Sequence, residues 1–294
     1  MPAEKIISSI LSESLPPSLH QLKNHLSREL HSLVNYSPTI GIMGKTGAGK
    51  SSLCNALFQS KVSRVSDIGR GTQTAQRLCL SVGKRTLTLI DLPGIGESQQ
   101  QDSAYQALYK QTLPELDLVI WVLRADERAW TSDEITYRFL VEQCGYERSR
   151  FLFVLNQADK IEPCREWHST YQQPSATQLH HLQQKIITVQ RAFSPHHPVI
   201  TISAKEGYQV PLFVELLIRA LPVNASSPTL KQLQSTHRNT TVNTLARQDF
   251  GQSVSQLIDN VIDALPLTSS LANPLVRIKE TVVYAALSVW KWLF

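Results

Sequence analysis

The chain has 294 residues, of which 42% are hydrophobic, and it carries a net charge of +5. This is enough apolar material for a packed core, and the length suggests one large domain or one domain with a helical extension. The charge permits contact with RNA or an anionic lipid surface without requiring it, and the four scattered cysteines form no C-x-x-C pair, which leaves a metal or redox cluster without support.

The N-terminal segment contains one predicted amphipathic helix. Over residues 18–36, leucines and a valine recur at spacings of three and four, which places them on one side of a helix. Pro38 ends this helix, and the apolar run 39–43 that follows predicts a strand. We therefore expect residues 1–37 to form an N-terminal helical segment.

A glycine-rich loop follows this strand. Residues 44–51 read Gly-Lys-Thr-Gly-Ala-Gly-Lys-Ser and match G-x-x-x-x-G-K-[ST] between a predicted strand and a predicted helix, the context that a phosphate-binding loop requires. Glycines let backbone N–H groups turn toward phosphate oxygens, and the start of the helix adds its positive end. In such a loop Lys50 reaches the β- and γ-phosphates, and Ser51 offers its hydroxyl to Mg²⁺.

Strands and helices alternate through the following residues. The further predicted strands are 77–82, 86–92, 116–123, 151–156 and 198–203. The predicted helices are 51–58, 102–111, 132–143, 175–193 and 211–221. This order predicts an α/β fold, a doubly wound and mostly parallel sheet over residues 38–222, and the near-continuous apolar strands are typical of a sheet buried on both faces. Residues 161–175 predict an irregular insertion.

Four short motifs occur in order at or near the ends of these strands. "DLPG" is residues 91–94, "NQAD" is residues 156–159, "SAK" is residues 203–205, and Thr74 lies in "GTQTAQR" just before a strand. Together with the glycine-rich loop they resemble the ordered motifs of the translation-factor-related GTPases, especially the Era-like class, which also includes TrmE-type proteins and septins. The resemblance covers residues 39–221 and implies a G domain of the P-loop NTPase fold.

The resemblance implies a role for each motif. Asp159 would read guanine, because a carboxylate can accept from both the ring N–H and the exocyclic amine, and adenine presents no such pair of donors. The backbone of residues 203–205 would support the guanine oxygen. Asp91 would hold Mg²⁺ through water, the Gly94 amide would face the γ-phosphate, and Thr74 would close on both.

The predicted site therefore surrounds one GTP or GDP molecule and one Mg²⁺ ion. The residues assigned to catalysis are Lys50, Thr74 and Gly94. The magnesium ligands are Ser51, Thr74 and Asp91. The nucleotide-contacting residues are Gly44, Thr46, Gly47, Ala48, Gly49, Lys50, Ser51, Ser52, Asn156, Gln157, Asp159, Ser203, Ala204 and Lys205.

Three positions depart from the pattern of the class. Gln157 replaces the usual lysine of the base motif, and we expect weaker nucleotide binding with guanine selectivity retained. Ile95 follows "DLPG", where Ras-like proteins have a glutamine that orients the attacking water, so we expect slow turnover or a water-positioning group from a partner. Gly47 stands where potassium-dependent relatives carry asparagine, so potassium activation is not supported.

Three arginines, Arg64, Arg70 and Arg77, flank the predicted switch around Thr74. The glycine-rich loop also resembles those of septin-like and immunity-related GTPases, some of which pair across the nucleotide face. One of these arginines is therefore a candidate finger in a homodimer. Solvated loop charges are the simpler interpretation, and we favour it.

The C-terminal residues 223–294 are predicted to be a linker and a helical segment. Residues 222–244 are polar and are predicted to be a linker or a weakly ordered segment, and two helices are predicted to follow at 250–265 and 275–294. The last helix is apolar along one side and has tryptophans near its end. It either lies on a membrane surface or docks on the G domain or the N-terminal leucine stripe, and we favour docking.

These features predict a Mg²⁺-dependent switch that binds GTP, hydrolyses it to GDP and acts on an unknown protein effector. The layout resembles the small bacterial YfjP-like GTPases, whose G domain is often labelled ribosome-binding, although no RNA-binding module is visible in the sequence. The alternative is a nucleotide-gated assembly or membrane-associated GTPase, septin-like or dynamin-like, whose output is oligomerisation. No secretory leader or apolar span is evident, so we expect a cytoplasmic protein, with peripheral membrane attachment through the C-terminal helix as the alternative.

Overall fold

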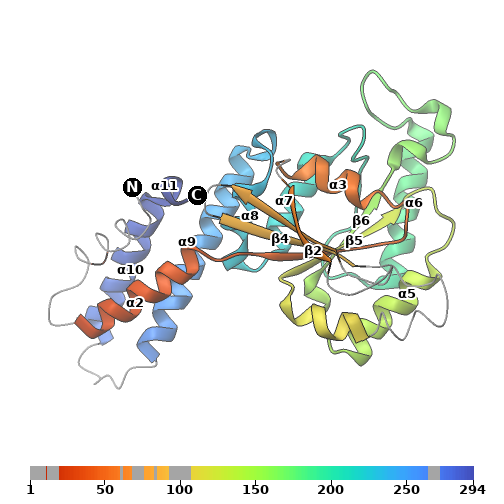
Figure 1. The fold of residues 1–294 in the computed structure, drawn as a ribbon. Coiled ribbons are helices and arrows are strands. Elements are labelled where there is room, and N and C mark those ends of the chain that lie inside the picture. The colour runs from red at the N-terminus through yellow and green to blue at the C-terminus, as the bar shows by residue number, and fades with distance from the viewer. Residues whose placement is uncertain are drawn as a thin grey trace. The chain divides into compact units, whose positions relative to one another are not determined.

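The computed structural model describes residue 11 and residues 20–59, 62–67, 76–82, 85–92, 107–263 and 272–294. The chain divides into two compact units (Figure 1). The sheet unit consists of Pro38–Pro222 and Gln232–Arg238. The helical unit consists of Met1–Ser37, Val223–Lys231 and Asn239–Phe294.

The sheet unit is built on a seven-stranded sheet with the order β2-β3-β4-β1-β5-β6-β7. The strands are β1 (Thr39–Met43), β2 (Val62–Asp67), β3 (Gln76–Val82), β4 (Arg85–Asp91), β5 (Leu118–Arg124), β6 (Phe151–Asn156) and β7 (Ile200–Thr201). Strands β4, β1, β5, β6 and β7 run parallel, and β3 and β2 extend the sheet beyond β4 as antiparallel neighbours. The predicted doubly wound, mostly parallel α/β fold is confirmed.

The central strands β5 and β6 are buried along almost their whole length, as their continuous apolar runs predict. On one face, Trp121 of β5 stacks on Phe153 of β6 with ring centroids 5.6 Å apart. Tyr137 meets both of these rings edge-on, at 5.9 and 5.1 Å. This close-packed layer fixes the strands whose carboxyl ends carry the predicted motifs.

Several helices among the described residues accompany the sheet. α3 (Lys50–Leu57) contacts α7 (Val210–Ala220), and α5 (Thr131–Arg138) contacts α6 (Ala176–Phe193). All four coincide with predicted helices within a few residues. Residues 107–112 are also helical, whereas the first part of the predicted helix 102–111 lies outside the described residues. The predicted insertion 161–175 is irregular, with a short 3₁₀ turn at Cys164–Glu166.

The helical unit contains α2 (His20–Val34), α8 (Val223–Gln232), α9 (Thr240–Asp263), α10 (Ala272–Ser288) and α11 (Trp290–Leu293). Both α2 and α10 pack on α9. The stripe of α2 is buried, with Leu22, Leu26 and Leu30 exposed by no more than 4%. The partner that this leucine stripe requires is thus α9.

The segment predicted as a polar linker, 222–244, is ordered, and the linker prediction is wrong. Its first part forms α8, in which the hydroxyl groups of two serines are buried and bonded. Ser226 Oγ donates to Asp249 Oδ2 at 2.5 Å, and Ser227 Oγ donates to the Ala246 carbonyl at 2.8 Å. Hydrogen bonds to α9 compensate these two hydroxyl groups for their burial. The polar composition of the segment does not reveal such partners, and for this reason it predicted a solvent-exposed linker.

The C-terminal end packs within the helical unit. Trp290 is 4% exposed, and its Nε1–H donates to Ser227 Oγ at 2.9 Å. The Phe294 ring lies 5.2 Å from the Phe250 ring of α9. The favoured docked arrangement is therefore found, but on α8 and α9 rather than on the leucine stripe. Trp292 remains 80% exposed. Among the described helices, none is long and apolar enough to cross a bilayer.

Candidate functional site

The glycine-rich loop joins β1 to α3 and requires its glycines. Gly44, Gly47 and Gly49 have φ values of 139°, 82° and 89°, in the region where other residues are strained. A β-carbon on Gly44 would lie 2.2 Å from the carbonyl oxygen of Val122 in β5, so a side chain there would collide with backbone. The loop is therefore held close to the sheet by the absence of side chains.

The mouth of this loop combines a lysine with a carboxylate of which one oxygen is buried. Lys50, the first residue of α3, donates from Nζ to the Gly44 carbonyl at 2.9 Å and lies 3.7 Å from Asp91 Oδ1 at the end of β4. Burial raises the pKa of Asp91, and the charge of Lys50 opposes this only in part. In the described part of the chain, the buried Asp91 Oδ1 has no hydrogen-bond partner. The geometry leaves an acceptor for a cation or its bound water.

Asn156 connects three separated segments through one side chain. It is the last residue of β6 and is 1% exposed. Its Nδ2 donates to the Ala48 carbonyl at 3.0 Å, and its Oδ1 accepts from the Ala204 amide at 3.0 Å. A β-carbon on residue 49 would lie 2.4 Å from Asn156 Nδ2, so only a glycine at this position leaves room for the Asn156 side chain. The loop, "NQAD" and "SAK" are therefore joined directly.

The two other predicted residues of "NQAD" face different segments. Gln157 donates from Nε2 to the Gly47 carbonyl at 2.6 Å. Asp159 Oδ1 accepts from Ser203 Oγ at 2.6 Å, and the same Oγ accepts from the Glu206 amide at 3.2 Å. A residue of "SAK", Ser203, thus fixes the Asp159 carboxylate.

The structure brings together most of the predicted residues. Loop residues Thr46, Ser51 and Ser52 are exposed. Lys205 is 78% exposed along its side chain and pairs with its neighbour Glu206 at 3.1 Å. The residues that lie outside the described part of the chain are Thr74, Gly94, Ile95 and Arg70.

One of the candidate finger arginines already has a partner. Arg77 Nη2 lies 2.6 Å from Glu115 Oε2, and the side chain is 28% exposed. Arg77 lies in β3 rather than in a loop, and its pairing with a carboxylate favours a structural charge over the finger role. The structure gives no side-chain description for Arg64, so its predicted role stays a prediction.

Two acidic side chains, one of them buried, hold the second residue of the loop. Lys45 Nζ lies 2.6 Å from Glu127 Oε1 and 3.4 Å from Asp133 Oδ2. Asp133 is 5% exposed and accepts from Trp121 Nε1 at 2.9 Å, and its burial raises its pKa despite these partners. Lys45 occupies an unspecified position of the loop motif, so the sequence carried no signal for this network.

A second unpredicted feature holds the other end of α3. We call residues 232–238 the α3 clasp. The Gln234 amide donates to the Leu57 carbonyl at 2.9 Å, and its side chain donates to the Asn55 carbonyl at 2.7 Å. The His237 ring meets the Ala56 carbonyl at 2.7 Å. These contacts satisfy the carbonyls that a helix leaves open at its C-terminal end.

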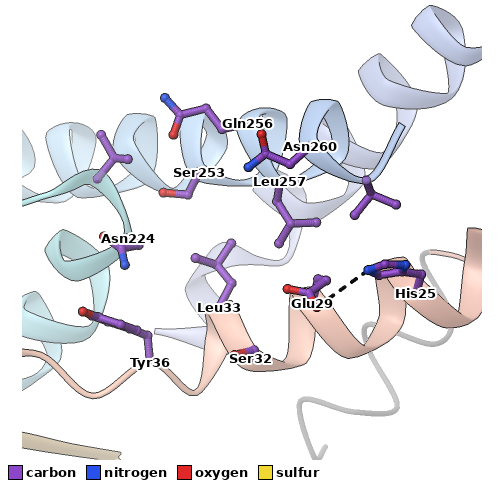
Figure 2. A pocket seen from close by; sticks show the side chains of 12 residues that line it. His25, Glu29, Ser32, Leu33, Tyr36, Asn224, Ser253, Gln256, Leu257 and Asn260 are labelled. Carbon is purple, nitrogen blue, oxygen red and sulfur yellow. Dashed lines mark ion pairs between the residues drawn. The ribbon is translucent and has the colours of Figure 1, made fainter. Parts of the chain in front are cut away.

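The helical unit has a cavity of its own, of about 460 Å³, between α2 and α9 (Figure 2). It is lined by both apolar and polar side chains, among them Leu33 and Leu257 and the ion pair His25–Glu29, whose closest atoms are 3.9 Å apart. None of the residues predicted from the sequence to bind nucleotide lines this cavity.

Comparison with known proteins identifies relatives over the whole chain. A family model described as "50S ribosome-binding GTPase" matches residues 39–157. YkfA of Escherichia coli (strain K12), an uncharacterized protein, is 41% identical over 283 residues, which cover 96% of each chain. YfjP of the same strain, also uncharacterized, is 38% identical over 274 residues and 93% of each chain. GTPase Era of Thermoanaerobacter sp. (strain X514) is 26% identical over 184 residues, which are 62% of this chain and 54% of Era.

The sheet order, the glycine-rich loop and the joined motifs define a P-loop GTPase of the Era-like class. Within that class, the chain belongs to the family of YfjP and YkfA. The resemblance inferred from the motifs is thereby confirmed.

Proposed function

We propose that this protein is a Mg²⁺-dependent switch that binds GTP, hydrolyses it slowly to GDP and thereby alters its contact with a protein effector. The observation that carries the proposal is the position of Asn156, whose one side chain bonds to the phosphate loop at Ala48 and to "SAK" at Ala204. A purine and its phosphates would therefore meet one pre-arranged unit, which lowers the ordering cost of binding.

Guanine selectivity is assigned to Asp159. Its carboxylate has about four lone-pair sites, of which the Ser203 hydroxyl uses one, so both oxygens retain acceptor capacity. The ring N–H and the exocyclic amine of guanine are two adjacent donors that match this capacity. Adenine offers no such pair on that edge, so ATP would leave a fixed carboxylate unpaired at a cost.

Phosphate binding is assigned to the loop amides, the start of α3 and Lys50. Asp91 Oδ1, which is buried and has no hydrogen-bond partner among the described residues, fits a site for hydrated Mg²⁺, with the exposed Ser51 hydroxyl as the inner ligand. Bound magnesium would supply charge neutralisation at the phosphate oxygens. The roles of Thr74 and Gly94 rest on the family resemblance, and Ile95 offers no group to orient water, which supports a slow intrinsic rate.

Phosphate release from GTP tests this function. The full chain is incubated with GTP in excess Mg²⁺ and, in parallel, with EDTA, and inorganic phosphate is followed over hours. We expect slow release that requires Mg²⁺. Nucleotide binding without release would remove the hydrolysis step, and the absence of both would overturn the proposal.

The assembly alternative is distinguished by particle size. The C-terminal end uses Trp290 and Phe294 inside the helical unit, which leaves fewer apolar groups for a membrane or a filament and supports the switch. Size-exclusion chromatography with light scattering compares GDP with a non-hydrolysable GTP analogue. A monomer in both states agrees with the switch, whereas assembly in the GTP-analogue state alone would favour the alternative.

A further inference from the structure

The base motif gives the phosphate loop a neutral contact. Gln157 donates from Nε2 to the Gly47 carbonyl at 2.6 Å, and its Oε1 is buried without a hydrogen-bond partner among the described residues. A nucleoside di- or triphosphate carries several negative charges. An amide group at this position supplies none of the opposing positive charge.

Among the described residues, three basic side chains lie near the loop, and one of them, Lys50, is already assigned to the phosphates. Lys50 holds the Gly44 carbonyl at the loop mouth. Lys45 is turned toward acidic partners, with Nζ 2.6 Å from Glu127. Arg124 is the third, since a β-carbon placed on Gly47 would lie 3.9 Å from its Nη1.

The fold holds Arg124 in this orientation. It is the last residue of β5 and pairs in register with Asn156 of β6, so its backbone is fixed by the sheet. Its Nε and Nη2 donate to the two carboxylate oxygens of Asp126 at 3.0 and 2.7 Å. This bidentate pair fixes the guanidinium plane. Nη1 is left beside Gly47, with no hydrogen-bond partner in the described part of the chain.

We propose that Arg124 is a nucleotide-binding residue whose Nη1 donates to the phosphate chain of a guanine nucleotide beside Gly47 and supplies the positive charge that Gln157 does not. This inference rests on the proposed function. Asp126 offsets part of the charge, and the side chain of Arg124 is 37% exposed, so solvent screens the interaction. The effect is therefore moderate and depends on direct contact.

Equilibrium titration of the full chain with a fluorescent GDP analogue in Mg²⁺ tests the proposal. We expect Arg124→Gln to weaken binding about fivefold, the size of one screened, charge-assisted hydrogen bond. Arg128→Gln is the matched control, because it removes the same charge from an exposed residue of the same connection. It should leave the affinity within about twofold of wild type, on the scale of a surface charge.

A double-mutant cycle gives the sharper outcome. Gln157→Lys places an ammonium group where the amide now meets Gly47. It should restore the affinity of Arg124→Gln to within about twofold of wild type, and the loss in Arg124→Gln should shrink as salt rises. A purely structural role for Arg124 would instead lower the melting temperature without nucleotide and would not be rescued.

Each result decides between the alternatives. Equal affinity of wild type and Arg124→Gln, or a loss that Gln157→Lys does not repair, overturns the proposal while leaving the proposed function intact. Wild-type protein that binds no GDP overturns both. If Arg124→Gln does not fold, Gln157→Lys alone carries the test: tighter binding by about threefold supports a charge deficit at Gly47, and unchanged binding contradicts it.

Discussion

The two compact units use their buried polar groups in different ways. In the sheet unit, Asn156 bonds to a carbonyl 108 residues away and to the Ala204 amide, and so joins two loops at the proposed nucleotide site. In the helical unit, the hydroxyls of Ser226 and Ser227 bond to α9 and to Trp290, and nothing beyond the unit is needed to satisfy them. Polar burial thus prepares a binding site in one unit and fixes helices in the other.

The largest difference between the units should come from removing one lysine in each. Lys50→Met removes the ammonium group that bonds the Gly44 carbonyl at the loop mouth, and we expect GTP affinity to fall about a thousandfold, as for a truncated charge pair in a closed site. Lys291→Met changes an exposed lysine of the helical unit and should not alter affinity. Isothermal titration calorimetry measures both. A tight-binding Lys50→Met would break the comparison.

In the helical unit, by contrast, we expect a substitution at a buried residue to change the stability of the protein, and two tryptophans allow this to be tested. Trp290→Ala removes a buried ring and its bond to Ser227, so we expect the free energy of unfolding to fall by about 3 kcal/mol. Trp292→Ala truncates a side chain that is 80% exposed and should change stability by less than about 0.5 kcal/mol. Urea denaturation compares the two. Equal losses would mean that the C-terminal end is not docked as described.

A base-specific change sharpens the role of the sheet unit. In Asp159→Asn, one acceptor oxygen becomes a donor NH₂ group, which opposes the exocyclic amine of guanine and matches the carbonyl that xanthine carries instead. We expect GTP affinity to fall about a hundredfold and XTP to become the better ligand. Competition with a fluorescent nucleotide measures the ratio. A variant that still prefers GTP would remove Asp159 from base recognition.

A smaller effect is expected at the α3 clasp. Gln234→Ala removes the side-chain bond to the Asn55 carbonyl but keeps the backbone bond to Leu57, so unfolding free energy should fall by about 1 kcal/mol. Gln183→Ala, on an exposed part of α6, is the control. If thermal melts show the same change for both, the clasp contributes nothing specific to α3.

The parts predictable from sequence are those that ligand chemistry or regular burial imposes. The structural requirement for glycine at position 44 could be predicted from the sequence motif, because the backbone there approaches Val122 so closely that no side chain fits. The central strands β5 and β6 could be predicted from the sequence because strands buried on both faces require unbroken apolar runs. The convergence of Asp159 and Ser203 followed from the rule that parallel strands end at one edge of the sheet.

The parts that escaped prediction depend on pairings that no local pattern encodes. The polar segment that forms α8 reads as a linker until α9 is present to satisfy Ser226 and Ser227. Gln234 caps a helix 179 residues away, and Lys45 meets Glu127 across 82 residues. Arg124 ends a buried strand and belongs to none of the motifs, so its approach to Gly47 appears only in three dimensions.

Nucleotide selectivity of the purified full chain tests the central claim most directly. Titrations with GTP and with ATP, each in Mg²⁺ and at the same ionic strength, give the ratio of the two dissociation constants. We predict that GTP binds at least about a hundredfold more tightly, since only guanine offers paired donors to Asp159. Equal affinity for GTP and ATP, or no binding of either, would contradict the assignment of this edge of the sheet as a guanine-nucleotide site.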